Sequence, residues 1–302
     1  MTDYRAEFDA EVTFLNGGGL QAQGFRLDVP GPDVSEWELA ATFVQQLGLL
    51  MTEQVRLSSV RILQEPHRGR RGQPAPAATG RPGRMVELSH VVTAGMTTYP
   101  GLPGPEISQH LTREASRAHY APGTEFEIGR ISMVGNTGTY LDSPYHRYPD
   151  GADLAGLPLV ALADLPAVVV RVAGSASRGI DVGALAAMEV TGCAVLLHTG
   201  WDRHFGTPAY RDPAPYLTAD GASWLADHGA RLVGIDAINI DDPVEGGERP
   251  AHSTLLAAGI PIVEHLTGLE QLPPAGARFS AVPPPITGFT TFPVRAFAMV
   301  PE

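Results

Sequence analysis

Two uninterrupted apolar runs, AVVVRV (residues 167–172) and CAVLLHTG (193–200), constrain the fold more than any other feature of the sequence. A strand exposed on one face alternates apolar and polar residues, whereas an unbroken, β-rich run is typical of a strand covered on both faces. Further buried strands are predicted in RLVGIDAINID (231–241) and IPIVEHL (260–266), with helices in DGASWLADHG and HSTLLAAG. The body of the chain is therefore predicted to be α/β, over residues 85–302.

A small unit precedes this body. FDAEVTFLN and LQAQGFRLDVP both alternate apolar and polar residues around a run of three glycines, which predicts a hairpin. Capping residues around Ser35 precede a helix at WELAATFVQQLGLLM (37–51), and VRLSSVRIL (55–63) returns to a strand. Residues 1–65 thus predict a β-β-α-β module. It carries more apolar surface than so short a unit buries alone, so we expect it to dock on the body or on a neighbouring chain, giving a homodimer or larger homo-oligomer.

Residues 66–84, PHRGRRGQPAPAATGRPGR, have almost nothing to bury and predict a linker. Its five arginines could bind an anion or nucleic acid. The simpler interpretation is a solvated tether, or an arm against an acidic neighbouring subunit.

The formal net charge of -12 argues against a nucleic-acid binder or an anionic-membrane binder, because either would normally carry a basic face. No apolar run approaches the roughly 20 residues that span a bilayer. The start, MTDYRAEFDAEV, is too polar for a signal peptide, so a cytoplasmic location is expected. The single cysteine, Cys193, is read as a buried small hydrophobe.

The stretch GNTGTYLDSPYHRY (135–148) carries the candidate chemistry. Its glycines and proline disfavour a helix, so the chain there is extended or turning. In an extended chain Asn136, Tyr140 and Asp142 share one face, and His146 follows after a bend. Such a group suggests a site, although polar residues beside Gly and Pro also occur in ordinary turns.

This stretch resembles the signature of the cyclase family, which includes bacterial kynurenine formamidases and isatin hydrolases. The family pattern is His-x-Gly-Thr-His-x-Asp-x-Pro-x-His, and Gly138, Thr139, Asp142, Pro144 and His146 match it in register. The resemblance continues in order through ELSHVVTAGMTTYPG, LLHTGW, VGIDAINID, HSTLLAAGIPIVEHLTGLEQL and FPVRAFA. It covers nearly all of residues 85–302 and implies a swivelling β/β/α-type domain, with residues 1–84 outside it.

The resemblance also implies two metal positions. The family's two signature histidines and its aspartate hold one ion, and these positions are Asn136, Tyr140 and Asp142 here. The second ion would be held by Asp142, His252 and Glu264, while His146 takes the acid/base position.

The two departures weaken the first position. A neutral amide is a poor zinc ligand, and a tyrosine must lose a proton of pKa about 10 to ligate. We therefore expect at most one divalent ion, Zn²⁺ or Mn²⁺, at Asp142, His252 and Glu264, or none. Without a metal, His146 and the two carboxylates could perform acid–base catalysis, with the Tyr140 hydroxyl donating to an oxyanion. A hydrogen-bonded cluster without function is the third possibility.

Asn136, Tyr148 and Trp201 are the candidate substrate-binding residues, although Tyr148 and Trp201 could equally be core or interface residues. Asp241, Asp242 and Glu245, in DDPVEGGERPAH, could present a metal ligand or cover the pocket, but an exposed acidic loop is the favoured interpretation. Together these observations favour a hydrolase that opens a C–N bond in a small amide, formamide or lactam, with His146, Tyr140 and Glu264 as catalytic residues. The alternatives are a metal-independent cyclase, dehydratase or lyase that uses the same pocket, and a non-catalytic small-molecule binder.

Overall fold

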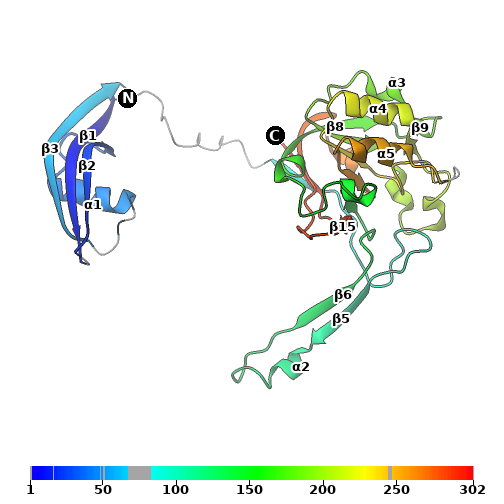
Figure 1. The fold of residues 1–302 in the computed structure, drawn as a ribbon, viewed down its shortest axis with the longest axis horizontal. Helices are drawn as coiled ribbons and strands as arrows, with labels where there is room; N and C mark the ends of the chain where they lie inside the picture. Colours follow the sequence, from blue (N-terminus) through cyan, green and yellow to red (C-terminus); the bar gives the residue numbers. More distant parts are fainter. Residues whose placement is uncertain are drawn as a thin grey trace. The chain divides into compact units, whose positions relative to one another are not determined.

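The computed structural model describes residues 2–15, 17–47, 49, 52–66, 83–243 and 247–301. The chain divides into two compact units, residues 1–79 and 80–302 (Figure 1). Most of the predicted linker, including four of its five arginines, lies outside the described residues.

The N-terminal unit has the predicted β-β-α-β order. It consists of β1 (Thr2–Phe14), β2 (Gly19–Val29), α1 (Glu36–Gln46) and β3 (Thr52–Pro66). The strands form an antiparallel sheet with β1 in the centre. Phe8, Phe25 and Phe43 pack edge-on or tilted at the centre of its core, with ring centroids 4.9–5.7 Å apart.

Helix α1 begins as the sequence predicts and ends earlier. The Ser35 side chain accepts from the Glu38 backbone N–H, and the Glu38 carboxylate accepts from that of Ser35, which forms a capping box. The predicted helix extended to residue 51, whereas α1 ends at Gln46 and β3 begins at Thr52.

The second unit is built on a nine-stranded sheet. Its order is β15-β7-β13-β12-β10-β8-β14-β16-β4, in which only β13, β12, β10 and β8 are mutually parallel. The strands are β4 (Arg84–Glu87), β7 (Tyr140–Asp142), β8 (Leu165–Arg171), β10 (Ala194–His198), β12 (Leu232–Ile235), β13 (Ile262–Glu264), β14 (Ala275–Ser280), β15 (Thr291–Pro293) and β16 (Phe297–Val300).

Both faces of the central strands are covered, as the apolar runs predict. Val195 and Leu197 of β10 join a core that contains α3 (Val182–Leu185), α4 (Ala219–Asp227) and α5 (Pro250–Ala257). Ala194 and Leu196, which point the other way, join the core of the opposite face. The α/β prediction is therefore confirmed.

The remaining elements are short. β9 (Gly179–Ile180) pairs with β11 (Tyr216–Leu217), and a hairpin of β5 (Glu106–Leu111) and β6 (Ile128–Ser132) extends from the unit with α2 (Arg113–Ser116) near its tip (Figure 1). The 3-10 turns are η1 (Pro144–His146), η2 (Leu159–Ala161), η3 (Trp201–His204), η4 (Pro208–Tyr210) and η5 (Leu269–Gln271). Among the described residues, no helix is both long and apolar enough to cross a bilayer.

Candidate active site

The pairing of three strands places the signature residues. β7 lies between β13 and β15, antiparallel to both, so that Tyr140 is opposite Glu264 and Asp142 is opposite Thr291. Directly opposed side chains on one face of a sheet lie within contact distance. Residues 120 to 150 positions apart in sequence therefore meet at this edge of the sheet.

Two glycines let the signature segment reach this position. Gly138 has a φ of +65°, in the left-handed region that side chains disfavour, and turns the chain into β7. A Cβ at Gly135 would lie 2.2 Å from the carbonyl oxygen of Thr291, so only glycine permits this close approach of the two segments.

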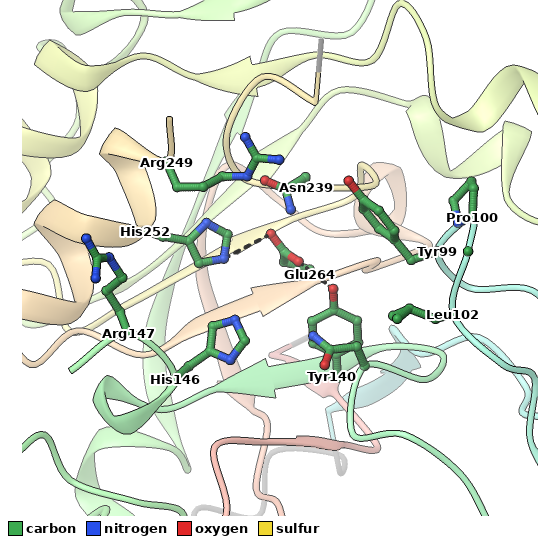
Figure 2. Close-up of a pocket in the computed structure, with 12 residues that line it drawn as sticks. Tyr99, Pro100, Leu102, Tyr140, His146, Arg147, Asn239, Arg249, His252 and Glu264 are labelled. Atoms are coloured by element: carbon green, nitrogen blue, oxygen red, sulfur yellow. Dashed lines mark hydrogen bonds and ion pairs between the residues drawn. The ribbon is translucent and has the colours of Figure 1, made fainter. Parts of the chain in front are cut away.

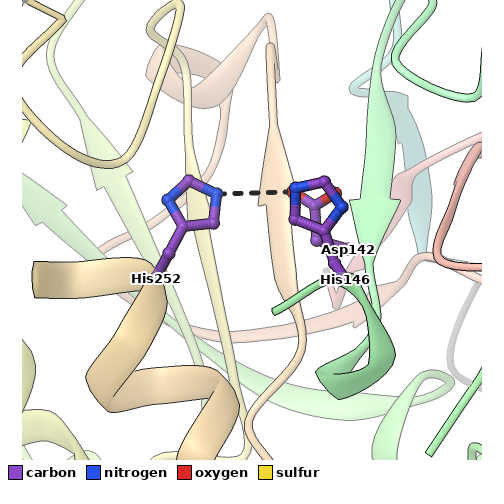
Figure 3. A group of neighbouring side chains, drawn as sticks. All are labelled: Asp142, His146 and His252. Carbon is purple, nitrogen blue, oxygen red and sulfur yellow. Dashed lines mark ion pairs between the residues drawn. The ribbon is translucent and has the colours of Figure 1, made fainter. Parts of the chain in front are cut away.

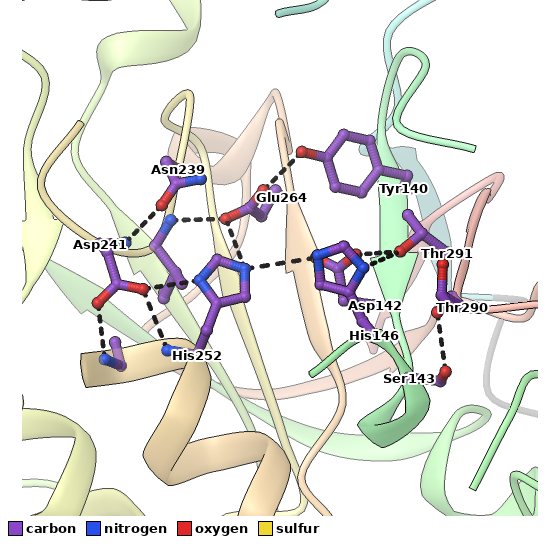
Figure 4. A network of polar contacts seen from close by, with 12 residues as sticks. Tyr140, Asp142, Ser143, His146, Asn239, Asp241, His252, Glu264, Thr290 and Thr291 are labelled. Atoms are coloured by element: carbon purple, nitrogen blue, oxygen red, sulfur yellow. Dashed lines mark hydrogen bonds and ion pairs between the residues drawn. The ribbon is translucent and has the colours of Figure 1, made fainter. Parts of the chain in front are cut away.

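The hydrogen bonds of Thr291 indicate which ring nitrogen of His146 carries a proton. The Thr291 hydroxyl donates its only proton to Asp142 Oδ1, so the contact of 3.1 Å between Thr291 Oγ1 and His146 Nδ1 must use the proton of Nδ1 (Figure 4). Neutral His146 then presents the lone pair of Nε2. Its side chain is 35% exposed, which leaves it accessible to a substrate or to water.

Asp241 fixes His252 in a similar way. The Asp241 carboxylate accepts from His252 Nδ1 at 2.7 Å, and also accepts from the backbone N–H groups of Ala251 and His252 at the start of α5. His252 Nε2 consequently faces Asp142 Oδ2 at 3.7 Å (Figure 3) and Glu264 Oε1 at 3.6 Å (Figure 4). A carboxylate behind a histidine is the usual support of a metal-ligating imidazole.

His252 Nε2 lies near one carboxylate oxygen of Asp142 and one of Glu264, as expected of a metal-ligating imidazole. Asp142 Oδ2 is buried and has no hydrogen-bond partner in the described part of the chain. Ligand atoms around an ion bound at about 2.0–2.2 Å are themselves about 3 to 3.5 Å apart, close to the separations found from His252 Nε2. The ligand atoms that all lie within 4.8 Å of one another are those of Asp142, His146 and His252, whereas Glu264 approaches His252. The residues present therefore fit a divalent metal.

The buried carboxylates of Asp142 and Glu264 favour a positive charge beside them. Burial lowers the pKa of His252, but Asp142, Asp241 and Glu264 outweigh it and raise the pKa to about 10. Burial raises the pKa of Glu264 to about 7, and Asp142 adds to this rise. Burial also opposes ionisation of Asp142, yet its contact with His252, followed by the positive charge that His146 carries whenever that ring is protonated, brings the pKa of Asp142 below its ordinary value. Either a second proton on His252 or a bound metal cation would supply this positive charge.

Tyr140 is fully enclosed beside this group. Its hydroxyl donates to Glu264 Oε2 at 2.6 Å, and His265 Nε2 lies 3.3 Å from the same oxygen. Burial, followed by the charges of Glu264 and Asp142, raises the pKa of Tyr140 well above its ordinary value. Tyr140 is therefore a neutral phenol, and its proton is directed at Glu264.

A cavity of about 470 Å³ opens over these side chains (Figure 2). Asn136, His146 and His252 line it together with Tyr140 and Glu264, and residues 99–102 supply an apolar wall.

Two of the three candidate substrate-binding residues do not line this cavity. The Tyr148 hydroxyl donates to the backbone carbonyl of Ser253, and the ring packs on the helical core. The Trp201 indole donates to the carbonyl of Tyr210. The structure thus brings together every predicted catalytic and metal-ligating residue and Asn136, but neither of these two aromatic residues.

The family model described as "Putative cyclase" matches residues 86–242, just over half of the chain. The chain belongs to this cyclase family. The match begins in β4 and includes the whole signature stretch, as the resemblance in the sequence predicts.

Curated cyclase-family relatives are named kynurenine formamidase. The protein from Geobacillus thermodenitrificans is 31% identical over 183 residues, which are 60% of this chain and 84% of that protein. The protein from Bacillus cytotoxicus is 28% identical over 212 residues, 70% of this chain and 95% of that protein. The present chain is accordingly an enzyme of the hydrolase class that acts on a small molecule, as predicted.

Solved structures share the fold. Isatin hydrolase A from Labrenzia aggregata, bound to benzyl benzoate, aligns with a TM-score of 0.62 and 24% identity over 72% of this chain and 94% of that chain. A structure titled as a potential metal-dependent hydrolase with cyclase activity aligns with a TM-score of 0.59 and 25% identity over 72% of this chain and 98% of that chain. The swivelling β/β/α-type prediction is confirmed by this likeness.

The prediction that Asp241 and Asp242 are exposed is wrong. Asp241 and Asp242 were expected in an exposed acidic loop, but they are only 1% and 8% exposed. Asp241 orients His252, and Asp242 pairs with Arg178 at 2.7 Å. Glu245 lies outside the described residues.

Sequence reasoning also missed Thr291, His265 and Tyr210 near the site, the last with its hydroxyl 3.0 Å from His265 Nδ1. The only available signal was the position of His265 directly after a predicted ligand. Thr291 and Tyr210 had no signal, because their contacts arise from strand pairing and loop packing.

Proposed function

We propose that this cyclase-family hydrolase cleaves the C–N bond of a small amide, formamide or lactam by attack of water on the carbonyl carbon. The observation that carries the proposal is the approach of His252 Nε2 to both Asp142 Oδ2 and Glu264 Oε1, beside the exposed ring of His146. The names of the relatives, kynurenine formamidase and isatin hydrolase, support this class of bond.

Asp142, His252 and Glu264 would hold one divalent ion, Zn²⁺ or Mn²⁺. When bound, such an ion supplies Lewis acidity that makes a water molecule more acidic and polarises a carbonyl. Asn136 and Tyr140 occupy the family's other ligand positions, and the neutral Tyr140 phenol instead donates to Glu264. One ion per chain is therefore expected.

His146 would move the protons of the reaction. Its Nδ1 proton is held by Thr291, so Nε2 can accept a proton from the attacking water. The water oxygen bonds to the carbonyl carbon, and the C–N bond then breaks as Nε2 returns the proton to the leaving nitrogen. The products are a carboxylic acid and an amine, or one molecule bearing both groups when the substrate is a lactam.

The test combines metal analysis with turnover. Untagged protein, purified without chelator, is analysed for metal and assayed with N-formylkynurenine and isatin as probes, because the relatives' names indicate these compounds. We expect one metal equivalent, with turnover lost in His252→Ala and reduced at least about 100-fold in His146→Gln. Two stoichiometric metals would overturn the single-ion arrangement, and wild-type turnover in His146→Gln would remove its acid/base role.

The high pKa of His252 also favours a second candidate, in which His252 keeps its second proton and the enzyme works without metal as a cyclase, dehydratase or lyase. Undiminished turnover after complete metal removal would favour this candidate.

A further inference from the structure

We propose that Tyr210 and His265 are positioning residues that, with Tyr140, form a one-directional chain of hydrogen bonds ending on Glu264. The chain runs Tyr210 Oη, His265 Nδ1, His265 Nε2, Tyr140 Oη and Glu264 Oε2. The proposal rests on the proposed function only for the role of Glu264 as a residue that would hold the metal ion.

The direction of each hydrogen bond follows from counting protons. A phenol has one proton, and Tyr140 gives it to Glu264, so the contact between Tyr140 Oη and His265 Nε2 requires a proton on Nε2. In a neutral imidazole the other nitrogen is then an acceptor. His265 Nδ1 therefore accepts from the Tyr210 hydroxyl, 3.0 Å away.

The surroundings of His265 keep the ring neutral. His265 has no exposed surface, and tyrosine hydroxyls are the only hydrogen-bonding partners of its ring in the described structure. A buried imidazolium without a carboxylate partner is strongly disfavoured. The backbone at His265 is also held in place, because its carbonyl accepts from the Thr139 hydroxyl at 2.6 Å.

Tyr210 thus selects the tautomer from outside the catalytic cavity. It is 3% exposed, does not line the cavity over Glu264, and packs with Ala214 and Ile238. With the opposite tautomer, Nε2 would become an acceptor and would compete with Glu264 for the Tyr140 proton. The Tyr210 hydroxyl disfavours this tautomer, because a proton on Nδ1 would make the hydroxyl an acceptor and leave its own proton without a partner among the described residues.

As a consequence, Glu264 offers only one of its two carboxylate oxygens to the reacting centre. Oε2 accepts from Tyr140, and Oε1 accepts from the Ile240 backbone N–H at 2.7 Å. The remaining lone pair of Oε1 faces His252 Nε2. The chain of hydrogen bonds would therefore present Glu264 to the reacting centre through a single oxygen.

The first test reads the tautomer directly, without substrate. Nitrogen-15 NMR of histidine-labelled protein should show the His265 ring protonated on Nε2, with its resonances identified by their loss in His265→Gln. In Tyr210→Phe we expect a mixture of tautomers, and in the control Tyr216→Phe the wild-type pattern. Protonation on Nδ1 in the wild type, or an unchanged Nε2–H ring in Tyr210→Phe, would overturn the proposal.

The second test is a double-mutant cycle on turnover of the probe that the wild type hydrolyses. Tyr210→Phe should lower kcat by about 10-fold, as loss of a residue supporting a catalytic group commonly does. In a Tyr140→Phe background the same change should have no further effect, because the chain is already broken. Multiplicative losses would show that Tyr210 and Tyr140 act independently, and would overturn the proposal. If neither the wild type nor any variant hydrolyses a C–N probe, the proposed function is wrong. The NMR result still tests the chain of hydrogen bonds in that case.

Discussion

Tyr140 stands where the cyclase-family signature has a histidine, and its surroundings suit a phenol. The ring is 2% exposed, and its oxygen lies between a carboxylate and a buried imidazole. A metal ligand there would have to be a phenolate, which burial and two nearby carboxylates oppose. At this position the residue therefore serves as a neutral donor.

We expect Tyr140→Phe to reduce turnover by about 10- to 100-fold with little change in structure, because it removes only the hydroxyl that supports Glu264. Tyr140→His should also lower turnover when metal is supplied, since imidazole replaces a directional donor. Steady-state kinetics on the identified substrate provide the measurement. Full activity in Tyr140→Phe would show that the hydroxyl has no role in catalysis.

His252 should release a proton when a metal ion binds. Its pKa is raised to about 10, so at pH 8 the metal-free site holds a proton on Nε2 that a cation must displace. Metal affinity should thus rise about tenfold per pH unit between roughly pH 7 and 10 and then level off. Calorimetry of Zn²⁺ binding in two buffers of different ionisation enthalpy should report release of about one proton at pH 8. A value near zero would mean that His252 is already neutral.

At the scale of elements, the start of α5 holds the orientation of His252. Asp241 accepts from two backbone N–H groups of this helix and from the His252 ring. We expect Asp241→Asn to weaken metal affinity by about 10- to 100-fold, because the uncharged amide supports the imidazole poorly. Competition with a chromophoric chelator measures this. Asp242→Asn is the matched control, as Asp242 pairs with Arg178 instead, and an equal loss there would point to a general effect on the loop.

The sequence predicted the elements whose pattern is local. The apolar runs marked β8 and β10, and the Ser35 cap marked the start of α1. The pairing of β7 with β13 and β15 is not local, because each partner lies more than 100 residues away. Asp241 was misread for this reason: its acidic neighbourhood resembles a solvated loop, and only the packing of α5 shows that it is buried.

At the scale of the whole molecule, each of the two units has its own core. Phe8, Phe25 and Phe43 belong to a cluster formed by residues of the N-terminal unit alone. We expect Phe8→Ala to lower the free energy of unfolding of this unit by about 3–5 kcal/mol and to leave the unfolding of residues 80–302 unchanged. Denaturant titration monitored by hydrogen exchange in both units would separate the two transitions. A single shifted transition would show that the units unfold together.

The same variant addresses assembly, for which we propose a homodimer or larger homo-oligomer. If the N-terminal unit makes the subunit contact, light scattering at micromolar concentration should show a lower mass for Phe8→Ala than for the wild type. A monomeric wild-type protein would contradict the proposal.

The pairing of β7 with its two neighbours also limits how such an enzyme can change over generations. Tyr140 is paired with Glu264, and Asp142 with Thr291, so a substitution on one strand immediately alters the surroundings of a residue on another. A substitution at position 140 would have to suit both the carboxylate of Glu264 and the imidazole of His265, which contact the present hydroxyl. Changes at positions 140, 264 and 265 are therefore expected to act together rather than independently.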